Sequence, residues 1–371
     1  MRITDVEPVV LRLAEVDVSR ADGTQDAFLV RVHTDEGLVG VGEADTSPYL
    51  ARTMVEMPAS HAISRGAREL LVGEDPSDPA RLWQLLYNGS SYYGRSALAL
   101  HVISAIDIAL WDIAGQAAGK PVCELLGGRA VDIPVYASEV MPDTPEGVRA
   151  IAEAAVGAGY AALKLGWGPL GRDPGLDEEL IRAARETIGP ERALMIDGGQ
   201  AYTVEQALAL LERVADVGLY WLEEPLAPDD YEGYRRLADA TEVRIAAGEA
   251  DATFEPFRRL VEQGGVDVLQ PDVSRCGGFT VARDILRLAR ERDVEVVPHC
   301  FSTGVLVAAS LHMAAGAAKP TYSEFSVADS PLAGGVLTSP FQLQGGTLAV
   351  PDRPGLGVDL DDETIGRLRV R

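Results

Sequence analysis

The chain has 371 residues, and its 33 basic and 57 acidic residues give a formal net charge of −24. Such an acidic chain argues against nucleic acid and anionic membranes as partners, because both favour basic surfaces. The length is too great for one ordinary domain, and a hydrophobic content of 47% fits a globular enzyme with an ample core.

Neither targeting signals nor disulfides are expected. The first residues, MRITDVEP, lack the apolar h-region of a signal peptide, and no run approaches the roughly 20 apolar residues of a membrane span. We therefore expect a cytoplasmic protein. The three cysteines, Cys123, Cys276 and Cys300, form no CxxC pair, which favours buried free thiols over a disulfide or a zinc site.

The first part of the chain has the pattern of a small α+β unit. The strand-like runs VEPVVLRL and FLVRVHT precede a turn, DEG, and the run LVGVGEA, which predicts an antiparallel meander. Helical stretches are predicted near residues 51–71, 78–88 and 96–118. Strands followed by helices indicate a separate α+β domain, which we assign to residues 1–125.

From about residue 132 short apolar runs alternate with helical patterns. The runs are IPVYAS, AALKL, LMID, LYWLE, RIAAGE, DVLQPD, VEVVPH and TYSEF, and segments such as DEELIRAARETI between them have helical spacing. Eight such strands predict a parallel α/β barrel, assigned to residues 126–330. The Gly/Pro-rich residues 331–371 are expected to return to the first domain.

Acidic or imidazole side chains close successive apolar runs of this barrel. They follow one another at intervals of 23 to 27 residues and are Asp197, Glu223, Glu249, Asp272, His299 and Glu324. One buried strand, one helix and two loops need about this length. In a parallel barrel the carboxyl ends of the strands meet at one mouth, so these side chains are predicted to converge.

The residue types at this mouth indicate a metal beside a base. Asp197, Glu223 and Glu249 offer the hard oxygen ligands that Mg²⁺ prefers, although single carboxylates at strand ends often serve only as helix caps or in salt bridges. Asp272 and His299 follow on neighbouring strands, where a carboxylate can fix one imidazole nitrogen and leave the other as a base.

Lys164 ends an earlier strand, nominally opposite the histidine. It could bind a carboxylate or act as a second base with a depressed pKa, or simply face solvent. The following segment, Gly166 to Gly171, matches GxGxxG, but no helical pattern opens within it, which argues against a dinucleotide site. We expect this loop to line a substrate pocket, with Trp167 as a wall, or to serve loop packing alone.

The motifs around these residues resemble the enolase superfamily, specifically its mandelate racemase subgroup. Matching segments are DIALWDIAG, GKPVCELLGG, MIDGGQAY, WLEEPLAP, LQPDVSRCGGF, PHCFSTGV and VPDRPGLGVDLD, which extend over nearly the whole chain. The resemblance implies a capping domain over a modified TIM barrel of the (β/α)7β type, and commonly a homo-oligomer. It also implies Mg²⁺ on Asp197, Glu223 and Glu249, an Asp272–His299 dyad, and Glu324 as a hydrogen-bond partner of the substrate carboxylate.

Two positions depart from the family pattern. Racemising members carry a Lys-x-Lys pair, whereas Gly166 follows Lys164 here, and the Asp-x-Asn of the metal strand has Gly199 in place of the Asn. A racemase needs bases on both faces of the carbanion, so we expect a Mg²⁺-dependent dehydratase of a sugar acid. In this hypothesis His299 takes the α-proton, the β-hydroxyl leaves, and a 2-keto-3-deoxy acid forms.

Two other readings stay open. A lactone cycloisomerase or an epimerase would use the same enolate, and a ligand-binding protein that has lost its activity would fit the two missing side chains. Loss of water separates the first from a dehydratase, and α-proton exchange into D₂O excludes the second. Substrate selectivity is expected to come from loops near residues 15–26 and 45–55 of the first domain.

Overall fold

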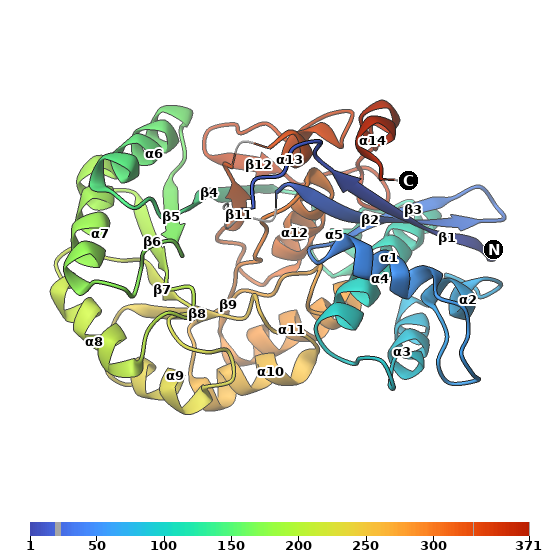
Figure 1. Ribbon diagram of the computed structural model, residues 1–371, viewed down its shortest axis with the longest axis horizontal. Coiled ribbons are helices and arrows are strands. Elements are labelled where there is room, and N and C mark those ends of the chain that lie inside the picture. Colours follow the sequence, from blue (N-terminus) through green and yellow to red (C-terminus); the bar gives the residue numbers. More distant parts are fainter. Residues whose placement is uncertain (19–23, 329, 371) are drawn as a thin grey trace.

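The computed structural model describes residues 1–18, 24–328 and 330–370 of the chain. A small sheet with its helices lies beside a ring of strands that is surrounded by helices, as Figure 1 shows from blue to red along the chain. The selectivity loop predicted at residues 15–26 lies partly outside the described residues.

The N-terminal sheet is the predicted meander. Strands β1 (Ile3–Arg12), β2 (Asp26–Thr34) and β3 (Val39–Ala44) pair in the order β1-β2-β3, and both pairings are antiparallel. Alternate apolar residues of these strands are buried against the helices of this domain. The strand predictions for this part of the chain are therefore confirmed.

The helices of this domain differ from the prediction at one point. They are α1 (Pro48–Glu56), α2 (Ala67–Leu71), α3 (Pro79–Gly89), α4 (Leu98–Ala118) and α5 (Val122–Leu125). The continuous helical stretch predicted at 51–71 is wrong, because the chain leaves the helix after Glu56. Pro58 explains the break, since a proline disfavours helical backbone at the residue before it and has no N–H to donate.

Helix α4 also corrects an expectation. It is 21 residues long and mostly apolar, so by length and composition one helix of the described chain could cross a membrane. Its apolar window is 83% buried inside the protein, where α4 packs against β3 on one side and against the barrel helix α11 (Gly278–Arg292) on the other. The helix is thus the shared core of the two domains.

Eight parallel strands form the barrel, as predicted. They are β4 (Asp132–Val140), β5 (Ala162–Gly166), β6 (Ala193–Asp197), β7 (Trp221–Glu223), β8 (Arg244–Ala247), β9 (Val268–Leu269), β10 (Glu295–Val296) and β11 (Ser323–Ser326). The hydrogen-bonded path runs from β10 through β4 to β11. At the gap between its two ends, Thr321 donates a hydrogen bond to Glu295.

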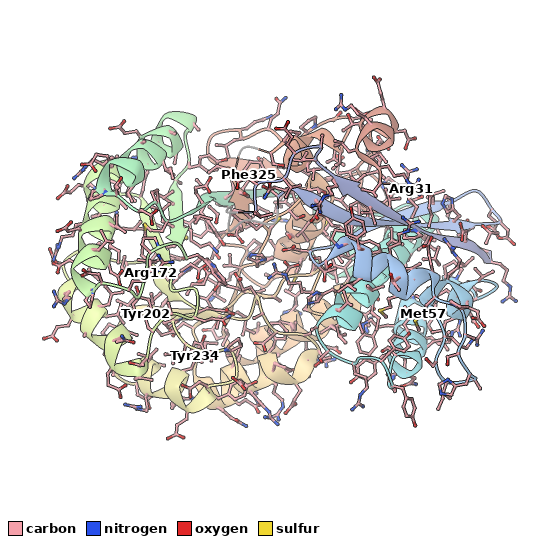
Figure 2. The ribbon with its side chains drawn as sticks, viewed as in Figure 1. Arg31, Met57, Arg172, Tyr202, Tyr234 and Phe325 are labelled. Carbon is pink, nitrogen blue, oxygen red and sulfur yellow. The ribbon has the colours of Figure 1, made fainter. Side chains whose placement is uncertain are left out.

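The barrel interior is filled with side chains rather than open. A buried layer lies across the strands below their carboxyl ends and consists of Tyr136, Ala162, Met195, Trp221, Ala246, Val268 and Val297. Side chains also fill the space between the strands and the outer helices, where Tyr202 and Tyr234 are labelled in Figure 2. The inner layer forms a rigid floor under any site at the mouth.

The outer helices follow the strands in sequence order. They are α6 (Pro145–Ala158), α7 (Pro174–Ile188), α8 (Val204–Arg213), α9 (Tyr231–Ala238), α10 (Phe254–Arg259), which continues into a π-helical turn (Leu260–Gly264), then α11 and α12 (Gly304–Gly316). Asp173 accepts hydrogen bonds from the first N–H groups of α7, and Thr203 forms a capping box with Gln206 at α8.

The C-terminal residues contact both domains. After α13 (Pro331–Gly335), strand β12 (Thr347–Ala349) pairs antiparallel with β4 of the barrel. Helix α14 (Asp362–Leu368) packs on β1, and the Val370 amide donates to the Val10 carbonyl oxygen at 2.8 Å. The division of the chain at residues 125 and 330 stays a prediction.

Buried carboxylates hold the two domains together. Glu43 of β3 accepts hydrogen bonds from the hydroxyls of Ser302 and Thr303 and from the amides of Thr303 and Leu306, at 2.6 to 3.1 Å. Asp107 of α4 accepts from the hydroxyl and the amide of Thr280 at 2.5 and 2.9 Å. These contacts hold the N-terminal domain over the barrel mouth.

Candidate active site

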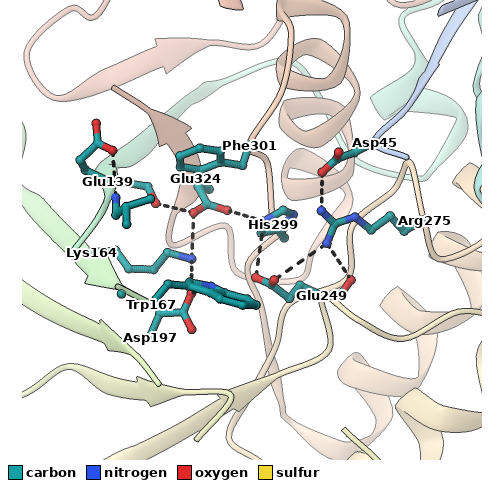
Figure 3. A pocket seen from close by; sticks show the side chains of 13 residues that line it. Asp45, Glu139, Lys164, Trp167, Asp197, Glu249, Arg275, His299, Phe301 and Glu324 are labelled. Atoms are coloured by element: carbon teal, nitrogen blue, oxygen red, sulfur yellow. Dashed lines mark hydrogen bonds and ion pairs between the residues drawn. The ribbon is translucent and has the colours of Figure 1, made fainter. Parts of the chain in front are cut away.

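A cavity of about 290 Å³ opens at the carboxyl ends of the barrel strands and reaches Asp45 of the N-terminal domain (Figure 3). Seven side chains were predicted to meet here. Five of them line the cavity, namely Lys164, Asp197, Glu249, His299 and Glu324. The other two, Glu223 and Asp272, are fully buried and contact residues of that lining. The structure therefore brings the whole predicted set together.

Three carboxylates form a group that could hold a metal ion. Asp197 and Glu223 end β6 and β7, and Glu249 follows β8 after a glycine. One oxygen from each lies within 4.8 Å of the others. Burial and then the charge of Glu223 hold the pKa of Asp197 well above its usual range, and burial raises the pKa of Glu223 to about 7 although Lys164 opposes the shift. Without a cation the three carboxylates therefore resist being ionised together, and a cation between them would favour their charged forms.

Glu223 and the adjacent Glu224 are held by side chains that the sequence reasoning missed. The indole of Trp221 and the amide of Gln270 both donate to Glu223 Oε2, at 3.1 and 2.6 Å. Glu224 accepts from Gln200 Nε2 at 2.9 Å and from the Gly248 amide at 3.1 Å. Gln270 stands two residues before Asp272, a spacing that could have indicated it.

Asp272 and His299 form the predicted pair, but both lie in loops rather than at the last strand residue. They follow the short strands β9 and β10 by three residues. His299 Nδ1 lies 2.8 Å from Asp272 Oδ2. The amide and hydroxyl of Ser274 donate to Asp272 Oδ1 at 2.7 and 2.6 Å. Burial raises the pKa of Asp272, but His299 and the nearby Arg275 outweigh it and lower this pKa to about 2.

The second imidazole nitrogen faces the metal-ligand group. His299 Nε2 lies 3.4 Å from Glu249 Oε2 and 3.7 Å from Glu324 Oε2. Burial lowers the pKa of His299, but these two carboxylates outweigh it and raise the pKa to about 10. Without a cation at the three carboxylates, His299 is therefore protonated at neutral pH.

Lys164 and Glu324 form an ion pair on the far side of the cavity. Lys164 Nζ lies 2.8 Å from Glu324 Oε1 and 2.6 Å from Glu223 Oε1. Burial opposes its charge, yet these carboxylates hold the pKa of Lys164 well above its usual range. The depressed pKa considered for Lys164 is wrong, because acids surround it. Glu324 also accepts from the Ser138 hydroxyl at 2.6 Å and the Cys300 amide at 2.7 Å.

Arg275 links the dyad to the N-terminal domain, and sequence reasoning did not find it. Its guanidinium pairs with Asp45 and lies 3.6 Å from Asp272 Oδ2. The Asp45 amide also donates to the Ser274 hydroxyl at 3.1 Å. Asp45 and Arg275 are 230 residues apart in sequence, so local pattern carried no signal for this pair.

The GxGxxG segment behaves as expected for a loop. Helix α7 begins only at Pro174, beyond Gly171, so no helix N-terminus opens within the motif. Trp167 lines the cavity, which agrees with the first of the two alternatives for this loop, and the binding of substrate there stays a prediction. All three cysteines are buried and free, also as predicted.

Two family models match the chain. The model described as Mandelate racemase / muconate lactonizing enzyme, N-terminal domain matches residues 5–127, and the one described as Enolase C-terminal domain-like matches residues 147–364. Together they cover most of the chain. The chain belongs to the enolase superfamily.

Similar proteins from this superfamily carry several activities in their names. A D-galactarolactone cycloisomerase of Agrobacterium fabrum is 33% identical, in an alignment that covers 92% of this chain and 91% of that protein. An L-rhamnonate dehydratase of Saccharopolyspora erythraea is 34% identical over 91% of this chain and 83% of its own length. The crystal structure of a racemase from Streptomyces coelicolor A3(2) with bound magnesium has a TM-score of 0.88 at 29% identity, covering 99% of this chain and 100% of that one.

Proposed function

We propose that this protein is a Mg²⁺-dependent sugar-acid dehydratase that removes the proton α to a carboxylate. The observation that carries the proposal is the position of His299. Asp272 holds its Nδ1 at 2.8 Å, while its Nε2 lies 3.4 Å from Glu249 Oε2, one of the three carboxylates that could hold a metal ion. A base fixed in one tautomer beside a cation site is the machinery that deprotonation of a weakly acidic carbon needs. Relatives named L-rhamnonate and D-galactonate dehydratases support the reaction class.

Asp197, Glu223 and Glu249 are the residues that would hold Mg²⁺. Their carboxylate oxygens lie close together, and Lys164 is the ammonium that contacts two of the three. Hard oxygen ligands of this kind are the ones that Mg²⁺ prefers. The bound ion supplies positive charge next to the substrate carboxylate and so stabilises the negative charge that develops on deprotonation. The bound magnesium named for the similar racemase structure supports this choice of metal.

His299 is the proposed base, and its charge state depends on the neighbouring carboxylate of Glu249. Because the Glu249 carboxylate helps to raise the pKa of His299 to about 10, neutralising Glu249 lowers this pKa toward the range in which the neutral imidazole accepts a proton. Asp272 stays ionised and holds the resulting imidazolium. The Lys164 ammonium would stabilise the carboxylate oxygens of the substrate from the opposite side.

Dehydration then needs only one face of the substrate. The α-carbon loses its proton to His299, the electron pair of the broken C–H bond forms the enediolate, and the C–O bond at the β-carbon breaks. His299 can return that proton to the departing hydroxyl, so that water leaves and the enol tautomerises to a 2-keto-3-deoxy acid. We expect syn elimination, because Gly166 stands where racemising members have the second lysine of the Lys-x-Lys pair, so no second base is present at that position.

A cycloisomerase is the second candidate. Two relatives are named D-galactarolactone cycloisomerase and 3,6-anhydro-alpha-L-galactonate cycloisomerase, and a one-base site also suits that reaction. A racemase or epimerase is less suited, since Lys164 is held as an ammonium between two acids. The proposal also includes a cytoplasmic location and a homo-oligomer.

A screen of mono- and diacid sugars and their lactones with Mg²⁺ tests the proposal. A dehydratase forms a 2-keto acid lighter than its substrate by one water, whereas a cycloisomerase forms a product of unchanged mass, and NMR with mass spectrometry separates the two. Formation of an isomer from a lactone would replace the first candidate by the second. A protein that exchanges no α-proton with D₂O for any acid would be a binding protein, which contradicts both.

A further inference from the structure

Trp167 has a backbone conformation that large side chains seldom adopt. Its φ is +59°, in the left-handed region, which strains a non-glycine residue. Gln200 and Glu224, just after β6 and β7, share positive φ values of 61° and 31°. Three successive strand ends around the acid group therefore hold strained residues, and such strain persists only where surrounding contacts enforce it.

Both groups that Trp167 donates from, its indole and its amide, bond to Asp197. The indole Nε1 donates to Asp197 Oδ2 at 3.1 Å, and the Trp167 amide donates to the Asp197 carbonyl oxygen at 3.2 Å. Oδ1 of the same carboxylate accepts the Gly199 amide at 2.9 Å. Trp167 thus holds both the main chain and one carboxylate oxygen of a proposed metal ligand, while its side chain stays 47% exposed in the cavity wall (Figure 3).

The two departures from the family pattern make room for this arrangement. A Cβ atom at Gly199, where the family pattern has Asn, would lie 3.1 Å from the Trp167 ring system. A Cβ atom at Gly166, where racemising members have Lys, would lie 2.2 Å from Asp197 Cβ. Real Cβ atoms tolerate neither distance well, so the two glycines, the indole and Asp197 form one packed unit.

We propose that Trp167 is a positioning residue for the metal site, that Gly199 replaces a larger side chain and so admits the indole, and that Gly166 leaves room for Asp197. The indole N–H aims the Asp197 carboxylate at the centre of the acid group, a task that polar partners of metal ligands commonly perform. The inference rests on the proposed function, because it assumes that Asp197 is a Mg²⁺ ligand. It adds a residue outside the ligand set.

Mg²⁺ titration by calorimetry, without any substrate, tests the inference. Trp167→Phe keeps an aromatic ring but removes the N–H, and we expect Mg²⁺ affinity to fall about 10-fold. Trp111→Phe is the matched control, because Trp111 Nε1 donates to Thr280 at 3.0 Å, away from the acid group. The Mg²⁺ affinity of Trp111→Phe should equal that of the wild type. The free energy of unfolding of metal-free Trp167→Phe, measured in urea, should also equal that of the wild type, whereas a merely structural role of Trp167 predicts a loss of stability.

A double-mutant cycle tests the role of Gly199. Gly199→Asn should lower Mg²⁺ affinity in the wild-type protein by pushing on the indole, and should cost less in a Trp167→Ala background, where the contact with the main chain of residue 167 remains. Equal affinities for the wild type and Trp167→Phe, or equal costs of Gly199→Asn in both backgrounds, would overturn the inference while Mg²⁺ binding stands. A wild-type protein that binds no Mg²⁺ would instead overturn the proposed function, and this inference with it.

Discussion

The barrel mouth and the interface between the domains both bury carboxylates, but the partners of these carboxylates differ. At the mouth, Asp197, Glu223 and Glu249 face one another, and among the described residues Lys164 is the one ammonium that contacts two of them. At the interface, Glu43 and Asp107 each stand alone and accept hydrogen bonds from hydroxyls and amides. Carboxylates that crowd one cavity repel one another even where they accept hydrogen bonds, so they call for a cation, whereas isolated carboxylates saturated by the chain's own donors are structural.

The largest expected effect separates the two regions by activity. His299→Asn at the mouth should lower turnover of the true substrate by about 10³- to 10⁴-fold, because the proton acceptor is lost. Mg²⁺ affinity should stay within a few-fold of wild type, since His299 is not a proposed ligand. Steady-state kinetics and calorimetry check both numbers, and retained turnover would remove His299 as the base.

At the interface the expected effect is on stability and depends on pH. Burial raises the pKa of Asp107 from 3.8 to about 7, although Thr280 donates to it. The folded state therefore binds the proton more tightly than the unfolded state, so the stabilisation from this group is complete below about pH 4 and is lost as the pH rises through 7. The free energy of unfolding of wild type relative to Asp107→Asn should fall by about 4 kcal/mol over this range. Urea unfolding at pH 4 and 7.5 measures it, and a difference that is constant with pH contradicts the account.

Mg²⁺ itself should distinguish the regions. At 100 times its Kd, Mg²⁺ should stabilise the folded protein by about 2.7 kcal/mol, since it binds the folded state. Glu249→Gln should abolish this gain without destabilising the metal-free protein, because it removes one of several buried like charges. Asp107→Asn should keep the full gain. Thermal unfolding with Mg²⁺ and with EDTA checks all three proteins; stabilisation of Glu249→Gln by Mg²⁺ would place the ion elsewhere.

The smallest expected effect concerns Ser274, which joins the two regions. Its hydroxyl donates to Asp272 and accepts the amide of Asp45 in the N-terminal domain. Ser274→Ala keeps the hydrogen bond from the backbone N–H of residue 274 to Asp272. Turnover should therefore fall only about 10-fold, and the Mg²⁺ affinity should not change. An unchanged rate would show that this contact does not orient the dyad.

The mouth was far more predictable from sequence than the interface. Asp197 and Glu223 are the last residues of buried strands at regular spacing, and in a parallel barrel the carboxyl ends of the strands meet at one mouth. Glu249, Asp272 and His299 follow strands that are shorter than expected, but the register still brings Glu249 and His299 to the cavity and Asp272 next to His299.

The interface could not be predicted because its contacts join distant segments without any repeat. Glu43 and Thr303 are 260 residues apart, and no local pattern relates them. The same holds for Asp45 and Arg275. The charge state of Lys164 could not be predicted from the sequence either, because its pKa depends on Glu223 and Glu324, which come from strands not adjacent to β5.

Hydrogen exchange at the α-carbon tests the central claim most directly. Sugar acids incubated with the protein in D₂O should incorporate deuterium at C2, read by NMR, only when Mg²⁺ is present, and Glu249→Gln should lose this exchange. Exchange that continues in EDTA, or that Glu249→Gln retains at the wild-type rate, would contradict the account.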